Sequence, residues 1–355
     1  MGNRVLMALD AAILVIVVVL WTPVLVAQAP SGPAELSAAL AARTWDPTAP
    51  APSGWTAPRT AWGDPDLQGY WLNFTYTPVE RPRQLADKQL YTVREAVEAF
   101  TKAVSLDAEV DPTTVHYDFN EYGMKAWQTP ARPNRRTALI VDPPDGRIPP
   151  LTAEAQKRQA AVAAEAARNP DVSTYPALFT RCIIGYNGWP RAPVNYQGET
   201  QFVQTPGYVL QIAQANQDVR IIPLDGRPHL PQDIRTWSGD ARGHFDGNTL
   251  VIESTNFNDK RDWRGSTSGL HLIERYTRVD PNILRYEFTV DDPTTWARSW
   301  TVENPMPRIQ APIYEGECHE TNYGIINVIK GLQQRQKEGI GPNGRAEVYR
   351  DEEGK

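Results

Sequence analysis

Cysteine and methionine are scarce in this sequence, with only 2 Cys and 4 Met among 355 residues. Two cysteines cannot form a four-cysteine zinc or iron–sulfur site, and they exclude a small fold held together by several disulfides. Charged residues make up 22 % of the chain and hydrophobic residues 41 %, which excludes a disordered chain and a bundle of membrane helices. A net charge of −6 provides no basic surface, so we expect no nucleic-acid partner.

Several catalytic motifs are missing as well. The chain has no GxSxG, which carries the nucleophile of many hydrolases, and no P-loop for binding phosphates. We therefore expect chemistry without an organic cofactor.

Proline and tryptophan, by contrast, are abundant. The chain has 31 Pro in 355 residues, about 9 %, against roughly 5 % in average proteins, together with 11 Trp. Because proline interrupts helices and central strands, this composition favours short strands and rigid loops over a bundle of helices.

The first 29 residues have the pattern of a signal peptide. Arg4 precedes an uncharged apolar run from Ala11 to Val26, and Ala27-Gln28-Ala29 fits the small-x-small cleavage site. The run is shorter than the about 20 apolar residues that a membrane span needs. We predict a periplasmic or secreted protein. The alternative is an uncleaved N-terminal anchor, which would be the only contact with a membrane.

An exported chain meets an oxidising environment, in which Cys182 and Cys318 would form a disulfide. The two residues lie 136 positions apart (318 − 182). Closing so long a loop would stabilise the folded state by roughly 4–5 kcal/mol in the chain-entropy model. Two buried free thiols are the alternative.

The remainder of the chain predicts a single β-rich domain over residues 63–338. Residues 30–62 are rich in Pro, Ala, Ser and Thr, which indicates a linker with a short helix from Ala34 to Arg43. Residues 339–355 would form a flexible tail.

Two or three peripheral helices are expected on this domain. Apolar residues recur near helical spacing within residues 84–108, and a second helix is predicted over residues 152–168. Thr152 would be the N-cap of the second helix, and Asn169-Pro170 would end it. Residues 320–338 predict a C-terminal helix.

Short strands separated by turn signals fill most of the domain. The expected strands begin at Gly69-x-Trp71, precede Asp142, flank Thr205-Pro206-Gly207 within 200–214, and cover 218–224, 249–255, 270–279, 283–290, 296–303 and 312–319. This arrangement predicts a mainly β fold, either an antiparallel barrel or a sandwich. Gly69-x-Trp71 at the start of a strand suggests an analogy with lipocalin-like barrels.

The hairpin formed by 270–279 and 283–290 predicts a carboxylate on its inward face. If Asp280-Pro281-Asn282 is the loop, Val279 faces Ile283, and Glu274 then shares an apolar face with Tyr276 and Tyr286. Burial without a partner would raise the pKa of Glu274 and suit it to general acid or base catalysis.

A structural role for Glu274 is the alternative to catalysis. In that case the carboxylate forms a salt bridge with an inward-facing arginine, for which Arg278 and Arg242 are the candidates.

Histidine, arginine and acidic residues gather in the C-terminal half, where four of the five His lie. The catalytic candidates are His244 with Asp240, His319 with Glu320, and Glu274. The ligand-binding candidates are Arg227, Arg242, His229, Trp237, Asn256 and His271. A mixture of ionisable groups next to Gly and Trp is typical of a polar site in an apolar cavity.

Three interpretations of this cluster stay open. A histidine oriented by a carboxylate could act as general base while the arginines bind an anionic group. Three histidines and a carboxylate could instead bind a divalent metal, although no HxH or HExxH spacing is present. The same residues could also form only the ion pairs that hold turns.

Seven motifs spread along the chain form a distinctive set. They are DPDLQGYW (64–71), DPPDGRIPPLT (142–152), IPLDGRPH (222–229), GDARGHFDGNTLVIESTNF (239–257), ERYTRVD (274–280), DDPTTW (291–296) and ECHETNYG (317–324). Together they resemble a large family of exported, β-rich bacterial proteins of uncharacterised function. The resemblance implies a signal peptide and a β-rich body, and it implies no activity or catalytic residue.

We expect an exported enzyme that performs acid–base chemistry on a small, partly apolar molecule by hydrolysis, elimination, hydration or isomerisation. A non-catalytic protein of the cell envelope that binds a small hydrophobic ligand is the alternative. A divalent-metal-dependent hydrolase or lyase is the second alternative, and an envelope scaffold is a third.

Overall fold

The computed structural model describes residues 30–108, 129–168, 181–183, 188–193, 198–215, 218–259, 263–310, 313–315, 318–320 and 322–338. The chain divides into two compact units, residues 1–39 and residues 40–355. The expected signal peptide and the expected C-terminal tail lie outside the described residues.

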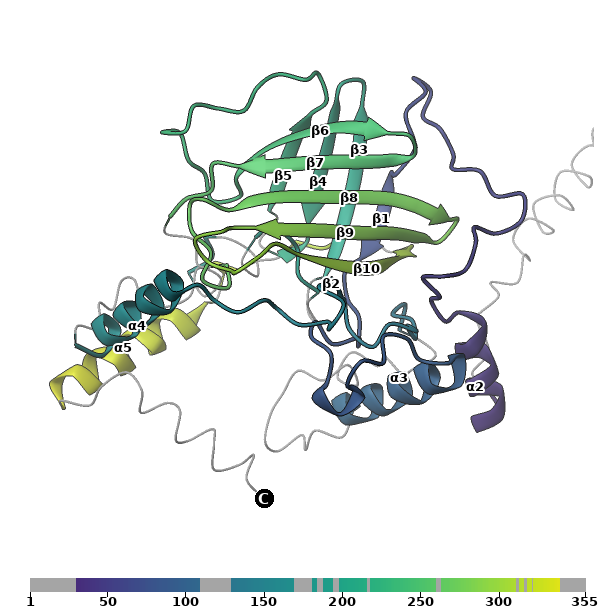
Figure 1. Cartoon of the computed structure of the whole chain (residues 1–355), viewed down its shortest axis with the longest axis horizontal. Helices are drawn as coiled ribbons and strands as arrows, with labels where there is room; N and C mark the ends of the chain where they lie inside the picture. The colour runs from purple at the N-terminus through teal and green to yellow at the C-terminus, as the bar shows by residue number, and fades with distance from the viewer. Residues whose placement is uncertain are drawn as a thin grey trace, which may run out of the picture. The chain divides into compact units, whose positions relative to one another are not determined.

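Ten antiparallel strands form one sheet in the larger unit (Figure 1). They are β1 (Gly69–Leu72), β2 (Ile140–Asp142), β3 (Glu199–Thr205), β4 (Tyr208–Ala213), β5 (Val219–Pro223), β6 (Asp240–Asp246), β7 (Thr249–Thr255), β8 (His271–Asp280), β9 (Ile283–Asp291) and β10 (Trp300–Ile309). The hydrogen-bonded order is β5-β4-β3-β1-β10-β9-β8-β7-β6, and β2 pairs with β10. The sheet is not closed into a barrel, so the predicted mainly β class is confirmed as a sandwich or open barrel.

The two end strands of this order, β5 and β6, approach each other closely at Gly243. A Cβ atom at Gly243 would lie 2.7 Å from Cγ2 of Ile222 and 2.9 Å from Cδ2 of Leu224. Only glycine leaves room for this approach. We call the line along which β5 and β6 meet the seam.

The predicted hairpin register is confirmed along most of β8 and β9. Glu274 pairs with Phe288 and Tyr276 with Tyr286, as the expected alternation requires. At the turn the prediction was wrong by one residue, because Asp280 and not Val279 faces Ile283. The register shifts between Arg278 and Asp280, which is a β-bulge.

Two predictions for the C-terminal strands need correction. The strand expected over 296–303 is β10, which starts at Trp300 because Asp292 organises a turn before it. The carboxylate of Asp292 accepts hydrogen bonds from the backbone N–H groups of Thr267 and Thr294. The strand expected over 312–319 is absent from the described residues there, 313–315 and 318–320.

The helices are α2 (Pro33–Ala42), α3 (Val93–Ala108), α4 (Ala153–Arg168) and α5 (Tyr323–Lys337), with a short 3₁₀ helix η1 (Arg83–Leu85). The predicted N-cap of α4 is confirmed, since the Thr152 hydroxyl accepts a hydrogen bond from the Ala155 N–H. The helix expected from residue 84 starts only at Val93. Its start is set by a capping box, in which Thr92 and Glu95 bond each other's backbone N–H. No helix in the described part of the chain is long and apolar enough to span a membrane.

Large aromatic side chains fill the core of the larger unit. Trp263 stacks on Trp300 with 5.9 Å between ring centroids, and Trp296 packs edge-on against both. Trp71 on β1 is fully buried. The abundance of tryptophan therefore serves the packing of the sheet interior.

Candidate functional site

The sheet interior contains a buried ion pair. Nη1 of Arg220 on β5 donates a hydrogen bond to Oε2 of Glu274 on β8 at 2.5 Å, and the side chains are only 3 % and 0 % exposed. The hydroxyls of Tyr276 and Tyr286 donate to Oε1 of Glu274 at 3.1 and 2.7 Å. Both carboxylate oxygens thus receive hydrogen bonds, as burial of a charge requires.

Four further contacts hold the guanidinium of Arg220. Its Nε donates to Oε1 of Gln211 on the neighbouring strand at 2.9 Å, and its Nη2 donates to the same oxygen. Nη1 contacts the Ser254 hydroxyl at 3.4 Å, and the guanidinium lies 4.0 Å from the ring centroid of Trp189. These hydrogen bonds use at most four of the five N–H groups, which leaves one N–H on Nη2.

The charges of this centre shift the pKa values of its members. Burial by itself lowers the pKa of Arg220, but the charge and hydrogen bond of Glu274, together with Tyr276 and Tyr286, outweigh burial and raise it. Burial raises the pKa of Tyr276 and Tyr286 well above the ordinary value, and the charge of Glu274 raises both further. The two tyrosines therefore act as neutral hydrogen-bond donors and not as bases.

A cavity of about 380 Å³ lies at the seam, next to this buried centre. It is lined by Ile183, residues 218–221 at the start of β5, and residues 236–241 at the start of β6. Arg220 belongs both to the cavity wall and to the buried centre. Val219 and Ile221 are 49 % and 59 % exposed beside it, so the wall presents apolar side chains next to polar groups. Such a mixture suits a small, partly apolar ligand.

The wall residue Asp240 also orients a histidine. Its Oδ2 lies 2.9 Å from Nδ1 of His229 and accepts a hydrogen bond from the Leu230 N–H at 2.9 Å. Its Oδ1 accepts from Nη1 of Arg242 at 2.6 Å. His229 does not itself line the cavity, and with Nδ1 occupied its Nε2 is the nitrogen left for another partner.

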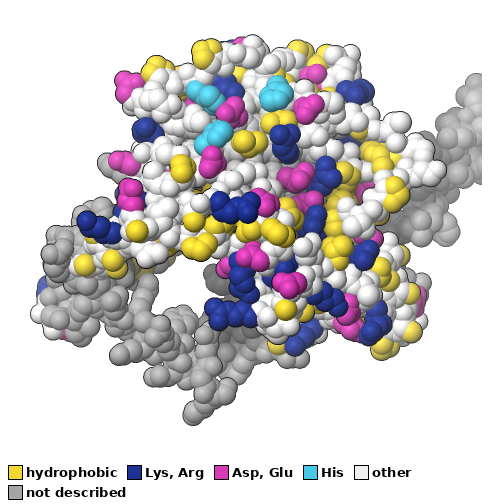
Figure 2. All heavy atoms as spheres, viewed as in Figure 1, with side chains coloured by type: hydrophobic (Ala, Val, Ile, Leu, Met, Phe, Trp, Pro, Cys, Tyr) yellow, Lys and Arg dark blue, Asp and Glu magenta, His cyan; other side chains and the backbone are white. Residues whose placement is uncertain are grey.

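The structure brings together three of the predicted site residues, His229, Asp240 and Arg242, and separates others. His271 bonds Glu253 at 2.6 Å, and Figure 2 shows histidines beside acidic side chains on the face in view. His244 is exposed on β6, and Asp240 bonds His229 in its place.

Glu274 does not share a site with the predicted catalytic histidines. It is fully buried in the sheet interior, whereas His244 is exposed on β6 and His319 and Glu320 are exposed beside the disulfide. Its arginine partner is Arg220, and the candidates Arg278 and Arg242 have other partners.

Two other predicted ligand-binding residues have local structural contacts. Arg227 pairs with Asp225, and this pairing lowers the pKa of Asp225 to about 2. The amide of Asn256 donates to three loop carbonyls, those of Leu230, Pro231 and Ile234. Trp237, in contrast, lines the cavity as a ligand-binding residue would.

Sequence reasoning missed Arg220, although a signal was present. In β5 the alternation of exposed and buried residues places Arg220 on the inward face, directly opposite Gln211 of β4. An arginine at an inward position of a strand requires a buried acceptor, so strand periodicity could have identified it.

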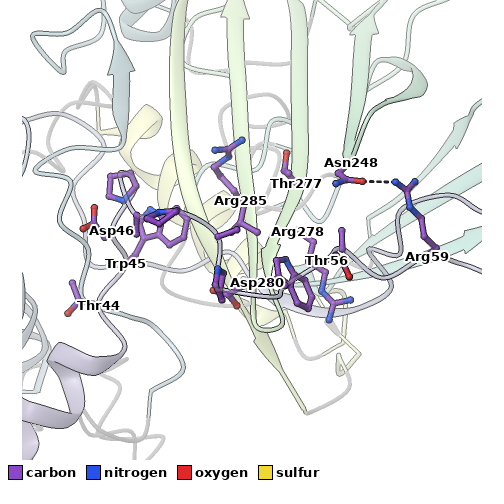
Figure 3. A pocket seen from close by; sticks show the side chains of 18 residues that line it. Thr44, Trp45, Asp46, Thr56, Arg59, Asn248, Thr277, Arg278, Asp280 and Arg285 are labelled. Carbon is purple, nitrogen blue, oxygen red and sulfur yellow. Dashed lines mark hydrogen bonds between the residues drawn. The ribbon is translucent and has the colours of Figure 1, made fainter.

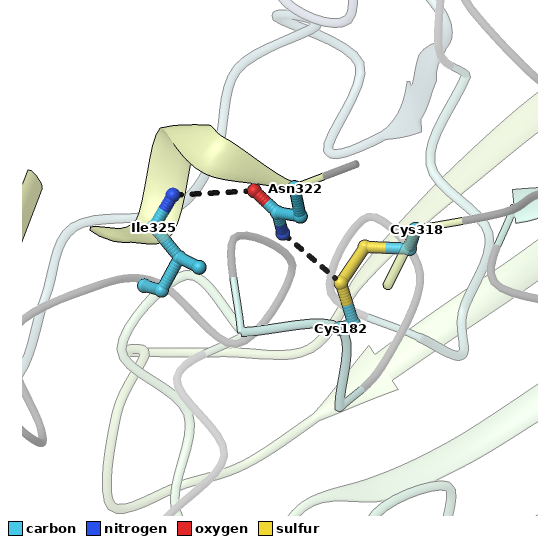
Figure 4. Close-up of a disulfide and its surroundings, with 4 residues drawn as sticks. All are labelled: Cys182, Cys318, Asn322 and Ile325. Atoms are coloured by element: carbon cyan, nitrogen blue, oxygen red, sulfur yellow. Dashed lines mark hydrogen bonds between the residues drawn. A yellow bond between two sulfur atoms is a disulfide. The ribbon is translucent and has the colours of Figure 1, made fainter. Parts of the chain in front are cut away.

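The predicted disulfide between Cys182 and Cys318 is present (Figure 4). Asn322, just before α5, donates to Sγ of Cys182 at 3.4 Å and accepts from the Ile325 N–H at 3.2 Å. The bond thus joins the start of α5 to the segment that carries the cavity residue Ile183.

The described residues contain no group of three or more His, Cys, Asp or Glu side chains that could hold a metal ion.

Comparison with models of known protein families found no match, and comparison with curated proteins found none either. The family resemblance of the seven motifs therefore stays a prediction.

Proposed function

We propose that this chain binds a small, partly apolar molecule in the seam cavity, with Arg220 as its polar anchor. The observation that supports the proposal is the position of Arg220, which belongs to the cavity wall while its charge is neutralised behind the wall by Glu274. The contacts with Gln211 and Trp189 hold the guanidinium in place before a ligand arrives, which lowers the entropic cost of binding.

The charge balance of the cavity favours a neutral oxygen acceptor over an anion. The charge of Arg220 is already paired with Glu274 and that of Asp240 with Arg242, and the wall adds the carboxylate of Asp218. A carbonyl oxygen of an ester, ketone or amide accepts the remaining N–H of Arg220 without adding another negative charge. Ile183 and Trp237 contact the apolar part of the molecule.

The test uses methyl phenylacetate and its free acid, phenylacetate, as probes of the full chain at pH 7. We expect saturable binding of the ester in calorimetry and several-fold weaker binding of the acid. Trp237→Ala should weaken ester binding at least fivefold, whereas Trp62→Ala, an exposed tryptophan outside the cavity, should leave it unchanged. Equal binding of ester and acid, or no effect of Trp237→Ala, contradicts the proposal.

Acid–base catalysis is a second candidate function, favoured by the pair formed by His229 and Asp240. This pair has the geometry of a general base oriented by a carboxylate, and Asp240 is also part of the cavity wall. If the bound ester is turned over, His229→Gln should abolish proton release from it and spare binding. His271→Gln, which removes the other carboxylate-paired histidine, is the matched control.

Export remains part of the proposal. The disulfide between Cys182 and Cys318 is compatible with an oxidising compartment. Mass spectrometry of the intact protein from the cell envelope should find a chain that starts after Ala27 or Ala29. A chain that retains residues 1–29 would indicate the N-terminal anchor instead.

A further inference from the structure

A second and larger cavity, of about 860 Å³, lies between residues 44–59 and the turn end of the β8–β9 hairpin (Figure 3). We call it the hairpin groove. Its walls include Trp45 and Trp55 on one side and Thr277 and Arg278 of β8 on the other. Its volume lies in the range of about 300–1,000 Å³ that is typical of ligand sites.

Hydrogen bonds hold the segment 44–59 against the domain. Nη2 of Arg59 donates to Oδ1 of Asn248 in the β6–β7 turn at 2.8 Å (Figure 3). The Trp45 N–H donates to the Pro133 carbonyl at 2.8 Å, and Asp46 pairs with Arg135 at 2.5 Å. The groove is therefore built from residues in defined positions, as a binding site requires.

Two features of the walls indicate a saccharide. Trp45 and Trp55 are only partly buried, so part of each indole faces the groove, where it can stack on the C–H face of a sugar ring. Asn248, Thr277 and Arg59 supply donors and acceptors for ring hydroxyls.

One arginine in the groove indicates that the saccharide carries an acid group. The guanidinium of Arg278 donates to the backbone carbonyls of Asp66 and Pro281, at 3.3 and 3.0 Å. It lies 5.6 Å from the ring centroid of Trp55, so its charge is next to a stacking surface. Burial lowers the pKa of Arg278, and the like charge of Arg308 lowers it further. Asp66 and Asp280 offset this repulsion in part, and a ligand carboxylate would offset it further.

We infer that the hairpin groove binds a short oligosaccharide that carries a carboxylate. Sugar rings stack on Trp45 and Trp55, and the carboxylate pairs with Arg278. This site is separate from the seam cavity, because the two share no lining residue, and it does not depend on the function proposed there.

The test compares tri-galacturonate with its trimethyl ester, in which each carboxylate has lost its charge and gained a methyl group. Titration of the full chain, followed by calorimetry and tryptophan fluorescence, should show saturable binding of the acid and at least fivefold weaker binding of the ester. Raising the salt concentration should weaken binding of the acid more than of the ester. This comparison needs no variant. Equal binding of acid and ester, or no saturable binding of the acid below about 10 mM, overturns the inference.

Variants locate the binding. Trp55→Ala should weaken the binding of both ligands at least tenfold, while Trp62→Ala, outside the groove, should leave the affinity for both unchanged. Arg278→Gln should remove the preference for the acid, and Arg275→Gln, an exposed arginine on the same strand, should preserve it. Thermal unfolding shows whether each variant is folded. Binding that is unaffected by both Trp55→Ala and Arg278→Gln places the sugar elsewhere and contradicts the inference.

Discussion

Arg220 and Glu274, 54 residues apart in the sequence, form an ion pair across the interior of the open sheet. Their strands are far apart in the ladder, because β4, β3, β1, β10 and β9 lie between β5 and β8 in the hydrogen-bonded order. The pair therefore connects β5, at one end of the ladder, with β8 across the interior of the sheet. It stabilises the curvature that brings these two strands near each other, in addition to any role in binding.

Removing the charge of Glu274 should destabilise the protein strongly. Glu274→Gln leaves the buried charge of Arg220 without a counterion, which typically costs about 3–5 kcal/mol. Urea unfolding should show this loss as a lower midpoint. Glu253→Gln, which breaks the exposed pair with His271, should change the free energy of unfolding by less than about 1 kcal/mol. Equal stability of the two variants would show that the buried pair contributes little.

The seam should not tolerate a side chain at Gly243. In Gly243→Ala the new methyl group would meet Ile222 and Leu224, and overpacking of this kind costs about 1–3 kcal/mol. Urea unfolding of the variant measures the cost. Gly331→Ala in α5 is the control, because an added Cβ there meets nothing within 4 Å. It should be neutral or stabilising by up to about 1 kcal/mol. A Gly243→Ala variant as stable as the parent would falsify the close approach of β5 and β6.

Stability should decline at alkaline pH because of Tyr276 and Tyr286. Both have raised pKa values in the folded state, so above about pH 10 the unfolded chain releases these protons first. Their contribution to the free energy of unfolding is complete below that pH and is lost as the pH rises toward the folded-state values. Absorbance of tyrosinate and the unfolding midpoint, followed together from pH 9 upward, check this. Tyr323→Phe, at an exposed position, should leave the profile unchanged, and buried tyrosines that ionise before unfolding begins would contradict the expectation.

Loss of the disulfide should affect both stability and the seam cavity. Replacing Cys182 and Cys318 by serine reopens a loop of sequence separation 136, which lowers the free energy of unfolding by about 4–5 kcal/mol in the chain-entropy model. Because Ile183 follows the cystine directly and lines the cavity, binding of methyl phenylacetate should weaken too. The comparison of oxidised, reduced and serine forms by thermal unfolding separates the loss of the bond from the substitution itself. Identical midpoints for all three forms would argue against a stabilising bond.

Local signals in the sequence determined most of the strands and turns and, within β8 and β9, which face each residue takes. Pro206-Gly207 joins β3 to β4, with Gly207 at a positive φ of 82°, and β7 runs over the predicted residues 249–255. The alternation of β8 placed Glu274 inward because side chains of a strand alternate with period two. The single possible pairing of two cysteines followed from their number.

Only the tertiary structure decided which inward faces meet. Strand periodicity assigns Glu274 to a face, but the order of strands in the ladder determines that Arg220, and not Arg278 or Arg242, reaches it. In the same way Asp240 bonds His229, since the loop after β5 folds back over the outer face of β6. The two residues of each contact belong to different elements, 54 positions apart for Arg220 and Glu274 and 11 apart for His229 and Asp240, and both contacts depend on how these elements pack. Local propensity therefore specified the elements, and the contacts between them specified the sites.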